Sequence, residues 1–499
     1  MPVSRHFLTS TALVLAVAAL AGCTVGPDFK RPAAPAAASY STPAGAPNVP
    51  SQTVAQPIDP AWWNIFHDPE LSSLEFRVAA ANLDVATATV RLAESRSQET
   101  IAGAAALPTL NGDASATAQR VSPRGVFGLF GGGGNAHGSS SVPLSGISLQ
   151  PFVLYQYGFD ASWEPDLWGK VRREVEAAKA DSAEQEDERR DALLSALAEV
   201  ARDYVSLRGI QTTLDITEKN IATAQQTVKL TSDRASNGLT SDLDVDNAAA
   251  DLSTEQSEIP ALEQQQSEMI NRLSYLLGET PGALAPELVT PAAVPPTPPE
   301  VPVGVPSELA RRRPDIREAE ANLHAATAEI GMAKADFYPS ISLTGSLDLQ
   351  ALKLKDLANW GARTYSAGPA LSLPIFSGGR LTGTLHLREQ QQQEAAIAYQ
   401  RTVLSAWHEV DNALTAYRAE QLRRDQLKTA ANMQSKSLVL ARDRYRQGLA
   451  DFLSVLDSQR QLLTTQQQLA QSTTNVSTNL VALYKALGGG WETSFPAAE

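Results

Sequence analysis

The sequence is nearly free of cysteine, and this scarcity excludes several kinds of site. Its 499 residues include one cysteine, Cys23, so intramolecular disulfides and cysteine-clustered zinc or iron–sulfur sites are ruled out. Six histidines are scattered along the chain, and no two stand four residues apart, the spacing that puts two metal ligands on one helix face. We therefore expect neither a metal site nor a bound cofactor.

The sequence also has few positively charged residues relative to negatively charged ones, and few long apolar runs. The chain has 41 Lys and Arg residues against 55 Asp and Glu residues, a net charge of −14. DNA and RNA binders neutralise phosphates with basic side chains, so a nucleic-acid partner is excluded. Beyond residue 22 no apolar run reaches the length of about 18 residues that a membrane-spanning helix needs. A mature chain that crosses a membrane must therefore use β-strands closed into a barrel.

The first 22 residues have the layout of a secretory signal. Arg5 gives a basic start, an apolar run extends from Leu13 to Leu20, and small residues precede Cys23. The segment Leu20-Ala21-Gly22-Cys23 resembles the bacterial lipobox, in which the signal is cut before the cysteine and the cysteine is lipidated. We therefore predict a covalent lipid on Cys23 that anchors the chain in the outer membrane. An ordinary signal peptide with a chance cysteine is the alternative.

Most of the remaining chain is two copies of one unit. Asp233-Arg234 matches Asp443-Arg444, and Gly238-Leu239 matches Gly448-Leu449, both at an offset of 210 residues. Residues 384–447 contain neither proline nor glycine and are rich in Ala, Gln, Glu, Leu and Arg, all good helix formers. We predict one long helical hairpin in each copy, with a glycine at its tip.

Two alternating segments precede the long helix of each copy. Apolar and polar residues alternate from Ile341 to Leu349, from Tyr365 to Ile375 and from Val153 to Trp163, and more weakly from Leu110 to Ala118. Strict alternation predicts strands with one apolar face, here of a length suited to tilted transmembrane strands. A soluble sheet packed on a core is the alternative. Single-chain barrels begin at eight strands, so four membrane strands require identical chains to complete one wall.

Several motifs together resemble those of one protein family. They are Cys23-Thr24-Val25-Gly26-Pro27-Asp28-Phe29, Arg313-Pro314-Asp315-Ile316, Phe337-Tyr338-Pro339-Ser340-Ile341, Tyr445-Arg446-Gln447-Gly448 and Leu483-Tyr484-Lys485-Ala486-Leu487-Gly488. They resemble the outer membrane factors of efflux systems, the TolC/OprM-like proteins, and are nearest the lipidated NodT-type branch. The resemblance extends over nearly the whole mature chain.

This resemblance implies an α+β membrane protein. Each chain of a homotrimer would supply four strands to a shared β-barrel of twelve strands, and long α-helical hairpins to a periplasmic α-barrel. The implied function is the outer-membrane channel of a tripartite efflux or export system. It would be a passive exit duct for substrates chosen by an inner-membrane transporter, often of the resistance-nodulation-division type, and by a periplasmic adaptor.

Two other classes of function are the alternatives to an efflux channel. A lipid-anchored trimeric coiled-coil stalk, structural or adhesive, would explain the long helices but not the four alternating strands. An enzyme is not expected, because the sequence has no nucleophile elbow, phosphate loop or paired histidines.

Candidate gate residues come from the same resemblance. Leu453 and Asp457 are four residues apart, so they share a helix face, and they match an apolar ring and a carboxylate ring at the periplasmic constriction. Asp244 matches an acidic position of the first hairpin. Arg444 and Tyr445 match positions that tie neighbouring hairpins together in the closed state.

The hairpin tips are the predicted docking site for the adaptor. They are formed by Gly238 and Leu239 in the first copy and by Gly448 and Leu449 in the second.

The predicted organisation follows the chain in six segments. These are a signal peptide (1–22), a lipidated extended segment (23–69), the first repeat (70–280), a proline-rich connector (281–306), the second repeat (307–488) and a C-terminal tail (489–499).

Overall fold

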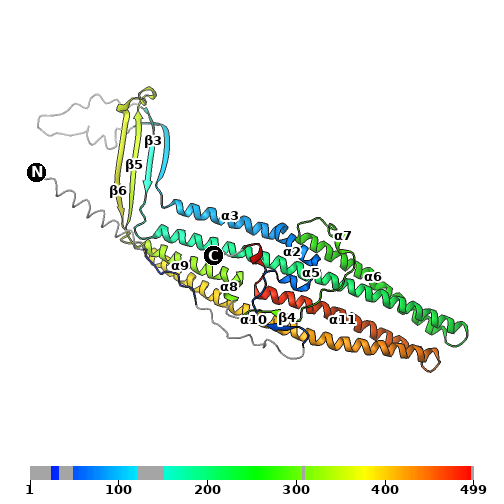
Figure 1. Cartoon of the computed structure of the whole chain (residues 1–499). Helices are drawn as coiled ribbons and strands as arrows, with labels where there is room; N and C mark the ends of the chain where they lie inside the picture. The colour runs from blue at the N-terminus through cyan, green and yellow to red at the C-terminus, as the bar shows by residue number, and fades with distance from the viewer. Residues whose placement is uncertain (1–23, 33–48, 121–150, 306–308, 496–499) are drawn as a thin grey trace, which may run out of the picture. The chain divides into compact units, whose positions relative to one another are not determined.

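The computed structural model of the chain describes residues 24–32, 49–120, 151–305 and 309–495 (Figure 1). It forms two compact units, each assembled from separate stretches of sequence. The first unit combines residues up to 29 with 97–179 and 325–392, and the second combines 30–96, 180–324 and 393 onward.

The first unit holds the antiparallel sheet. Its elements are β2 (Thr109–Gln119), β3 (Phe152–Trp163), β5 (Ser340–Ala351), β6 (Arg363–Ser372), η3 (Leu354–Asp356) and η4 (Trp360–Ala362).

Four helices contribute residues to both units. They are α3 (Leu83–Ala104), α5 (Lys170–Ser236), α9 (Pro314–Ala335) and α10 (Arg380–Arg446). The second unit also contains β1 (Gln52–Val54), η1 (Trp62–Phe66), α2 (Pro69–Ala81), α6 (Asp242–Leu276), α7 (Ala285–Leu288), β4 (Glu300–Pro302), α8 (Leu309–Arg312), α11 (Phe452–Leu487) and η5 (Trp491–Thr493).

The sheet has the strand order β2-β3-β5-β6, with β2 and β6 at its edges. Its register pairs Phe159 with Leu347 and Leu347 with Tyr365, so these apolar side chains share one face. Strand β6 is an edge strand and accommodates Pro369, but it ends at Ser372, ahead of the second proline of this segment, Pro374. The expectation that the last strand reaches Ile375 is therefore wrong, while the four strands and their alternating faces are confirmed.

The long helices form two hairpins of almost equal size. Helices α5 and α10 each have 67 residues, and α6 and α11 have 35 and 36. The internal repeat predicted from the sequence is thus present in the fold. Helix α11 begins at its N-cap Asp451, whose carboxylate accepts a hydrogen bond from the Ser454 backbone N–H, and ends at Gly488 in the left-handed conformation.

The main hydrophobic core of the second unit surrounds two tryptophans of η1. Trp62 and Trp63 are fully buried, and the ring of Trp62 stacks on Tyr484 with centroids 5.3 Å apart. Leucines of α2, α5 and α11 surround them. Burial of such large side chains contributes roughly 1.5 to 3 kcal/mol each. This core fastens the N-terminal segment to the helices that carry the hairpins.

The proline-rich connector packs on helix α5 through its backbone. The side chain of Gln211 donates to the carbonyl oxygen of Leu288 at 2.7 Å, and Arg208 donates to that of Thr290 at 3.0 Å. Farther on, β4 pairs in parallel with β1. None of the helices in the described ranges is both long enough and apolar enough to cross a lipid bilayer.

Candidate functional site

Each helical hairpin turns at a glycine. Gly238 and Gly448 have φ angles of 67° and 74°, the left-handed region in which a side chain is strained. At the first turn the Leu239 N–H donates to the Arg234 carbonyl at 2.9 Å, and at the second the Leu449 N–H donates to the Arg444 carbonyl at 2.8 Å. These bonds occupy carbonyls that the helix end would otherwise leave without partners. Both tips therefore have the same geometry.

The leucines of the tips point away from the chain's own core. Leu239 and Leu449, which follow the two glycines, are 64% and 69% exposed. Leu453, the second residue of α11, is similarly exposed. Exposed apolar side chains grouped at one end of a molecule indicate a contact surface.

Asp457 lies on α11 with its carboxylate in solvent. The side-chain amide of Gln461 donates a hydrogen bond to this carboxylate at 3.1 Å. Asp244 lies in the first turn of α6 and accepts a hydrogen bond from the Thr240 hydroxyl. Neither carboxylate forms an ion pair with another residue in the described part of the chain.

The two remaining gate candidates, Arg444 and Tyr445, have opposite surroundings. Tyr445 is buried, packs against Phe452 with ring centroids 5.7 Å apart, and lies beneath the guanidinium of Arg234. The side chain of Arg444 is exposed and has no ion-pair partner among the described residues. Within one chain, Tyr445 is therefore part of a contact between hairpins and Arg444 is not.

Sequence reasoning missed Arg234 and Phe452. A signal for Arg234 was available, because the offset of 210 residues makes it the counterpart of Arg444. Phe452 follows the N-cap Asp451 and gave no such signal.

A buried polar network joins four helices above the tips. Arg442 of α10 donates to the Thr227 hydroxyl of α5 at 2.9 Å and to the side-chain oxygen of Gln459 of α11 at 3.3 Å. The amide of Gln459 donates to Glu255 of α6 at 3.4 Å. Burial raises the pKa of Glu255 and lowers that of Arg442. A buried network of this kind favours one arrangement of the four helices.

Two further bridges join α6 to α11. Arg460 contacts Asp251 at 2.7 Å, and Gln467 donates to Glu258 at 2.9 Å. The hairpins of one chain are thus cross-linked internally, while Leu453, Asp457 and the tip leucines remain available for contacts with other molecules.

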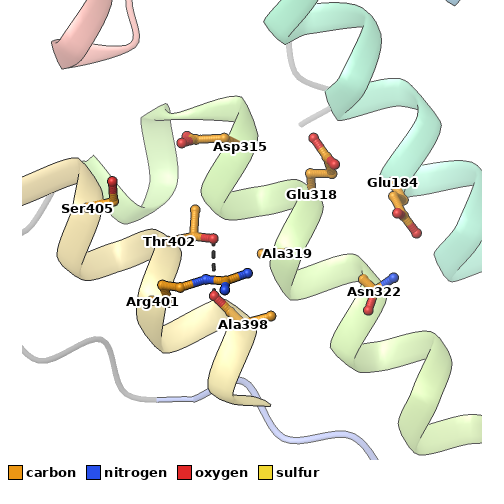
Figure 2. Close-up of a pocket in the computed structure, with 9 residues that line it drawn as sticks. All are labelled: Glu184, Asp315, Glu318, Ala319, Asn322, Ala398, Arg401, Thr402 and Ser405. Carbon is orange, nitrogen blue, oxygen red and sulfur yellow. Dashed lines mark hydrogen bonds between the residues drawn. The ribbon is translucent and has the colours of Figure 1, made fainter. Parts of the chain in front are cut away.

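An acidic cavity of about 560 Å³ lies between α5, α9 and α10 (Figure 2). Glu184 and Glu318 project into the same space, with Asp315 on α9 and Arg401 on α10 also in its lining. Burial, followed by the charges of Glu184, Asp191, Glu188 and Asp315, raises the pKa of Glu318 to about 7. These surroundings therefore favour the protonated form of Glu318.

The predicted lipidation site, Cys23, lies outside the described residues. The segment that follows it packs against α5 and α9 and against the residues just before α5. The Val25 N–H donates to the Trp168 carbonyl at 3.0 Å, and the buried guanidinium of Arg173 contacts Asp28 at 2.7 Å. Gly26 lies against Gly331 so closely that a Cβ atom there would approach the Gly331 Cα to 2.5 Å. These contacts of Val25, Gly26 and Asp28 fix the backbone shortly after Cys23.

The described residues contain no group of three or more His, Cys, Asp or Glu side chains arranged to hold a metal ion.

Known proteins share both the sequence and the fold of this chain. The family model of outer membrane efflux proteins matches residues 77–279 and 305–489. The probable efflux pump outer membrane protein TtgC of Pseudomonas putida is 33% identical over 97% of this chain and 96% of its own. Outer membrane protein OprJ of Pseudomonas aeruginosa is 32% identical over the same shares. The solved outer-membrane channel OprN superposes with a TM-score of 0.84 at 31% identity, covering 94% of this chain and all of its own.

These likenesses confirm the predicted α+β channel fold, the outer-membrane location with a periplasmic extension, and the role of channel component in an efflux system. The matched residues include both hairpins and their tips. The chain belongs to the outer membrane efflux protein family.

Proposed function

We propose that three copies of this chain close one passive duct, and that the hairpin tips form its periplasmic gate. The edge strands β2 and β6 carry this proposal. Each has one neighbour in the sheet, so each leaves a row of backbone N–H and C=O groups without partners in the chain. In lipid every such group costs several kcal/mol, so pairing β2 of one copy with β6 of the next removes the cost.

In this assembly Leu453 and Asp457 form the constriction. Three Asp457 carboxylates around one axis attract cations and repel one another, so the closed tips need ties that oppose this repulsion. Arg444 is exposed in one chain and is available to pair with an acidic group of the next, such as Asp244. Tyr445, held beneath Arg234, positions the end of α10 beside this contact.

The partners follow from the exposed tips. Gly238, Leu239, Gly448 and Leu449 offer a periplasmic adaptor two apolar turns per chain, six in the trimer. Relatives named as efflux pump components support a tripartite system with an inner-membrane transporter, which we expect to be of the resistance-nodulation-division type. A lipid on Cys23 would hold the seated segment at the membrane. We expect no catalysis and no cofactor.

Planar-bilayer recording tests this function. The purified full-length protein should form discrete channels, and Asp457→Ala should raise the basal conductance or reduce the preference for cations. Glu218→Ala is the matched control, because Glu218 is an exposed carboxylate on α5 that lies 18 residues before the helix end, about 27 Å away.

Two results would contradict parts of the proposal. A protein that never conducts would favour the lipid-anchored stalk. Single-channel behaviour unchanged by Asp457→Ala would remove Asp457 from the gate.

A further inference from the structure

The connection between β5 and β6 combines basic and apolar side chains at one end of the sheet. It contains Lys353, Lys355 and, at the start of β6, Arg363, with Asp356 as its one acidic residue. Leu352, Leu354 and Trp360 are each more than 60% exposed. These four charged residues give the turn a local excess of positive charge in a chain whose net charge is −14.

Chain connectivity places this turn at the cell surface. Helix α9 leads into β5 and β6 leads into α10, so both helices join the sheet at the end opposite the turn (Figure 1). The protein extends from the outer membrane into the periplasm through its helices. The β5–β6 turn therefore lies at the outer leaflet.

The strand register places Arg363 on the apolar face. Arg363 pairs with Leu349, and two residues farther Tyr365 pairs with Leu347, so these four side chains share one face of the sheet. The apolar face is the one that suits lipid. At its outer end an arginine and an 80% exposed tyrosine therefore stand side by side on the lipid-facing surface.

Trp360 completes this surface. The guanidinium of Arg363 lies over its indole ring, 5.0 Å from the centroid, and donates to the Trp360 carbonyl at 2.8 Å. Asn359 caps the short helix η4 by accepting from the Gly361 N–H at 3.0 Å. The turn is therefore ordered, and Arg363 keeps N–H groups free to bind an anion because the stacking uses only its face.

The lysines add charge without internal neutralisation. Lys353 and Lys355 are exposed, and neither forms an ion pair with another residue in the described ranges. Their charges complement phosphate, and the flanking leucines complement acyl chains. An indole ring at a membrane boundary suits the headgroup level.

From this geometry we propose that the β5–β6 turn binds a phosphorylated glycolipid of the outer leaflet. Arg363 and the two lysines contact its phosphates, and Trp360, Leu352 and Leu354 contact its sugar and acyl boundary. The proposal rests on the orientation of the sheet in the outer membrane, and it is independent of the gate.

A binding titration tests the site. The purified full-length protein is titrated with detergent micelles that contain diphosphorylated lipid A, at low ionic strength. A basic residue at an anionic lipid surface strengthens binding roughly fivefold, so the double variant Lys353→Gln/Lys355→Gln should bind about 25-fold more weakly. The matched control Lys428→Gln/Lys436→Gln removes two exposed lysines of α10 and should bind as the wild type does.

Further arms separate the possible sources of binding. Dephosphorylated lipid A should bind far more weakly than the diphosphorylated form, and phosphatidylglycerol should compete with it only partly at equal phosphate concentration, through its charge alone. Equal affinity of the two double variants, equal binding of dephosphorylated lipid A, or full competition by phosphatidylglycerol would each overturn the proposal. The conductance of the turn variant should match that of the wild type, because the turn is not part of the gate. Lipid binding and conductance are therefore separate readouts: a protein that binds lipid A but never conducts would contradict the proposed channel function and leave the lipid site standing.

Discussion

The guanidinium of Arg234 lies over the ring of Tyr445, 4.7 Å from its centroid. Its Nη1 also donates to the backbone carbonyl of Arg446 at 3.1 Å. Arg234 is near the end of α5 and Tyr445 is near the end of α10, so this contact joins the two hairpins of one chain where each is about to turn. A tie in this place holds the two tips at a fixed separation.

Arg234→Gln should loosen that tie. The cation–π contact and the hydrogen bond together stabilise the tip by about 1 to 2 kcal/mol for a partly exposed arginine. Loss of this contribution should speed amide hydrogen exchange of residues 440–450 by about tenfold, since about 1.4 kcal/mol corresponds to a factor of ten. Hydrogen exchange followed by mass spectrometry measures the change.

Arg446→Gln is the control for this experiment. Among the described residues its side chain forms one ion pair, an exposed contact of 3.5 Å with Asp443, and exposed pairs contribute little to stability. Equal acceleration in both variants would show that loss of any tip charge, and not of the Arg234 tie, causes the change.

The sequence predicted the tips but not their internal partners, for a physical reason. Gly238 and Gly448 interrupt long stretches rich in helix-forming residues, so local propensity alone locates the turns. Arg234 and Arg444 occupy equivalent positions of the two repeats, yet one is stacked on Tyr445 and the other is exposed. Only the packing of α5 against α10 distinguishes them.

Helix α6 is a second case in which packing overrides a local signal. Pro260 suggests a helix boundary, because proline removes a backbone hydrogen bond in a helix interior. The helix nevertheless continues through Pro260 to Leu276. Bridges from Asp251 and Glu258 to α11 hold the helix before the proline, and the buried side chains of Ile270 and Leu273 hold it in the core after the proline.

The stability of the helical unit should fall as pH rises from about 4.5 to 7. The pKa of Glu318 is raised to about 7 in the folded chain, first by burial and then by neighbouring carboxylates. The folded state therefore keeps its proton where the unfolded state loses it, and this favours unfolding at higher pH. Glu318→Gln removes the effect and should stabilise the protein at pH 8 by roughly 1 to 2 kcal/mol, a value reduced for solvent screening of a half-buried group.

Thermal unfolding at pH 5 and pH 8 measures this difference. Glu394→Gln, which changes an exposed glutamate of α10, should leave the pH dependence as in the wild type. An identical pH profile for Glu318→Gln and wild type would remove the acidic cavity as its source.

Glu75 should destabilise the core in which it lies. Its side chain is fully buried on α2 beside Leu71 and Leu74, and neither carboxylate oxygen has a hydrogen-bond partner among the described residues. Burial raises the pKa of this carboxyl well above its usual range, so its cost is smallest in acid and grows as pH rises. Glu75→Met should stabilise the protein at pH 8 by about 1 to 3 kcal/mol, with a smaller gain at pH 5. Chemical denaturation at pH 5 and pH 8 measures the change. Glu94→Met, which replaces an exposed glutamate of α3, is the control. If Glu75→Met destabilised the protein at both pH values, the Glu75 carboxylate would have a stabilising partner after all.

Gly26→Ala should release the segment that follows Cys23. Gly26 has a φ angle of 103°, and an added Cβ would approach the Cα of Gly331 to 2.5 Å, so the change combines backbone strain with a clash against rigid backbone. A cost of about 1 to 3 kcal/mol predicts that trypsin cleaves after the exposed Lys30 roughly five to 150 times faster. Gly103→Ala is the control, because an added Cβ meets nothing within 4 Å there. The variant would keep the Asp28–Arg173 ion pair and the hydrogen bond from Val25 to Trp168. Unchanged cleavage would mean that these two contacts are enough to hold the segment, and that the close approach of Gly26 to Gly331 is not needed.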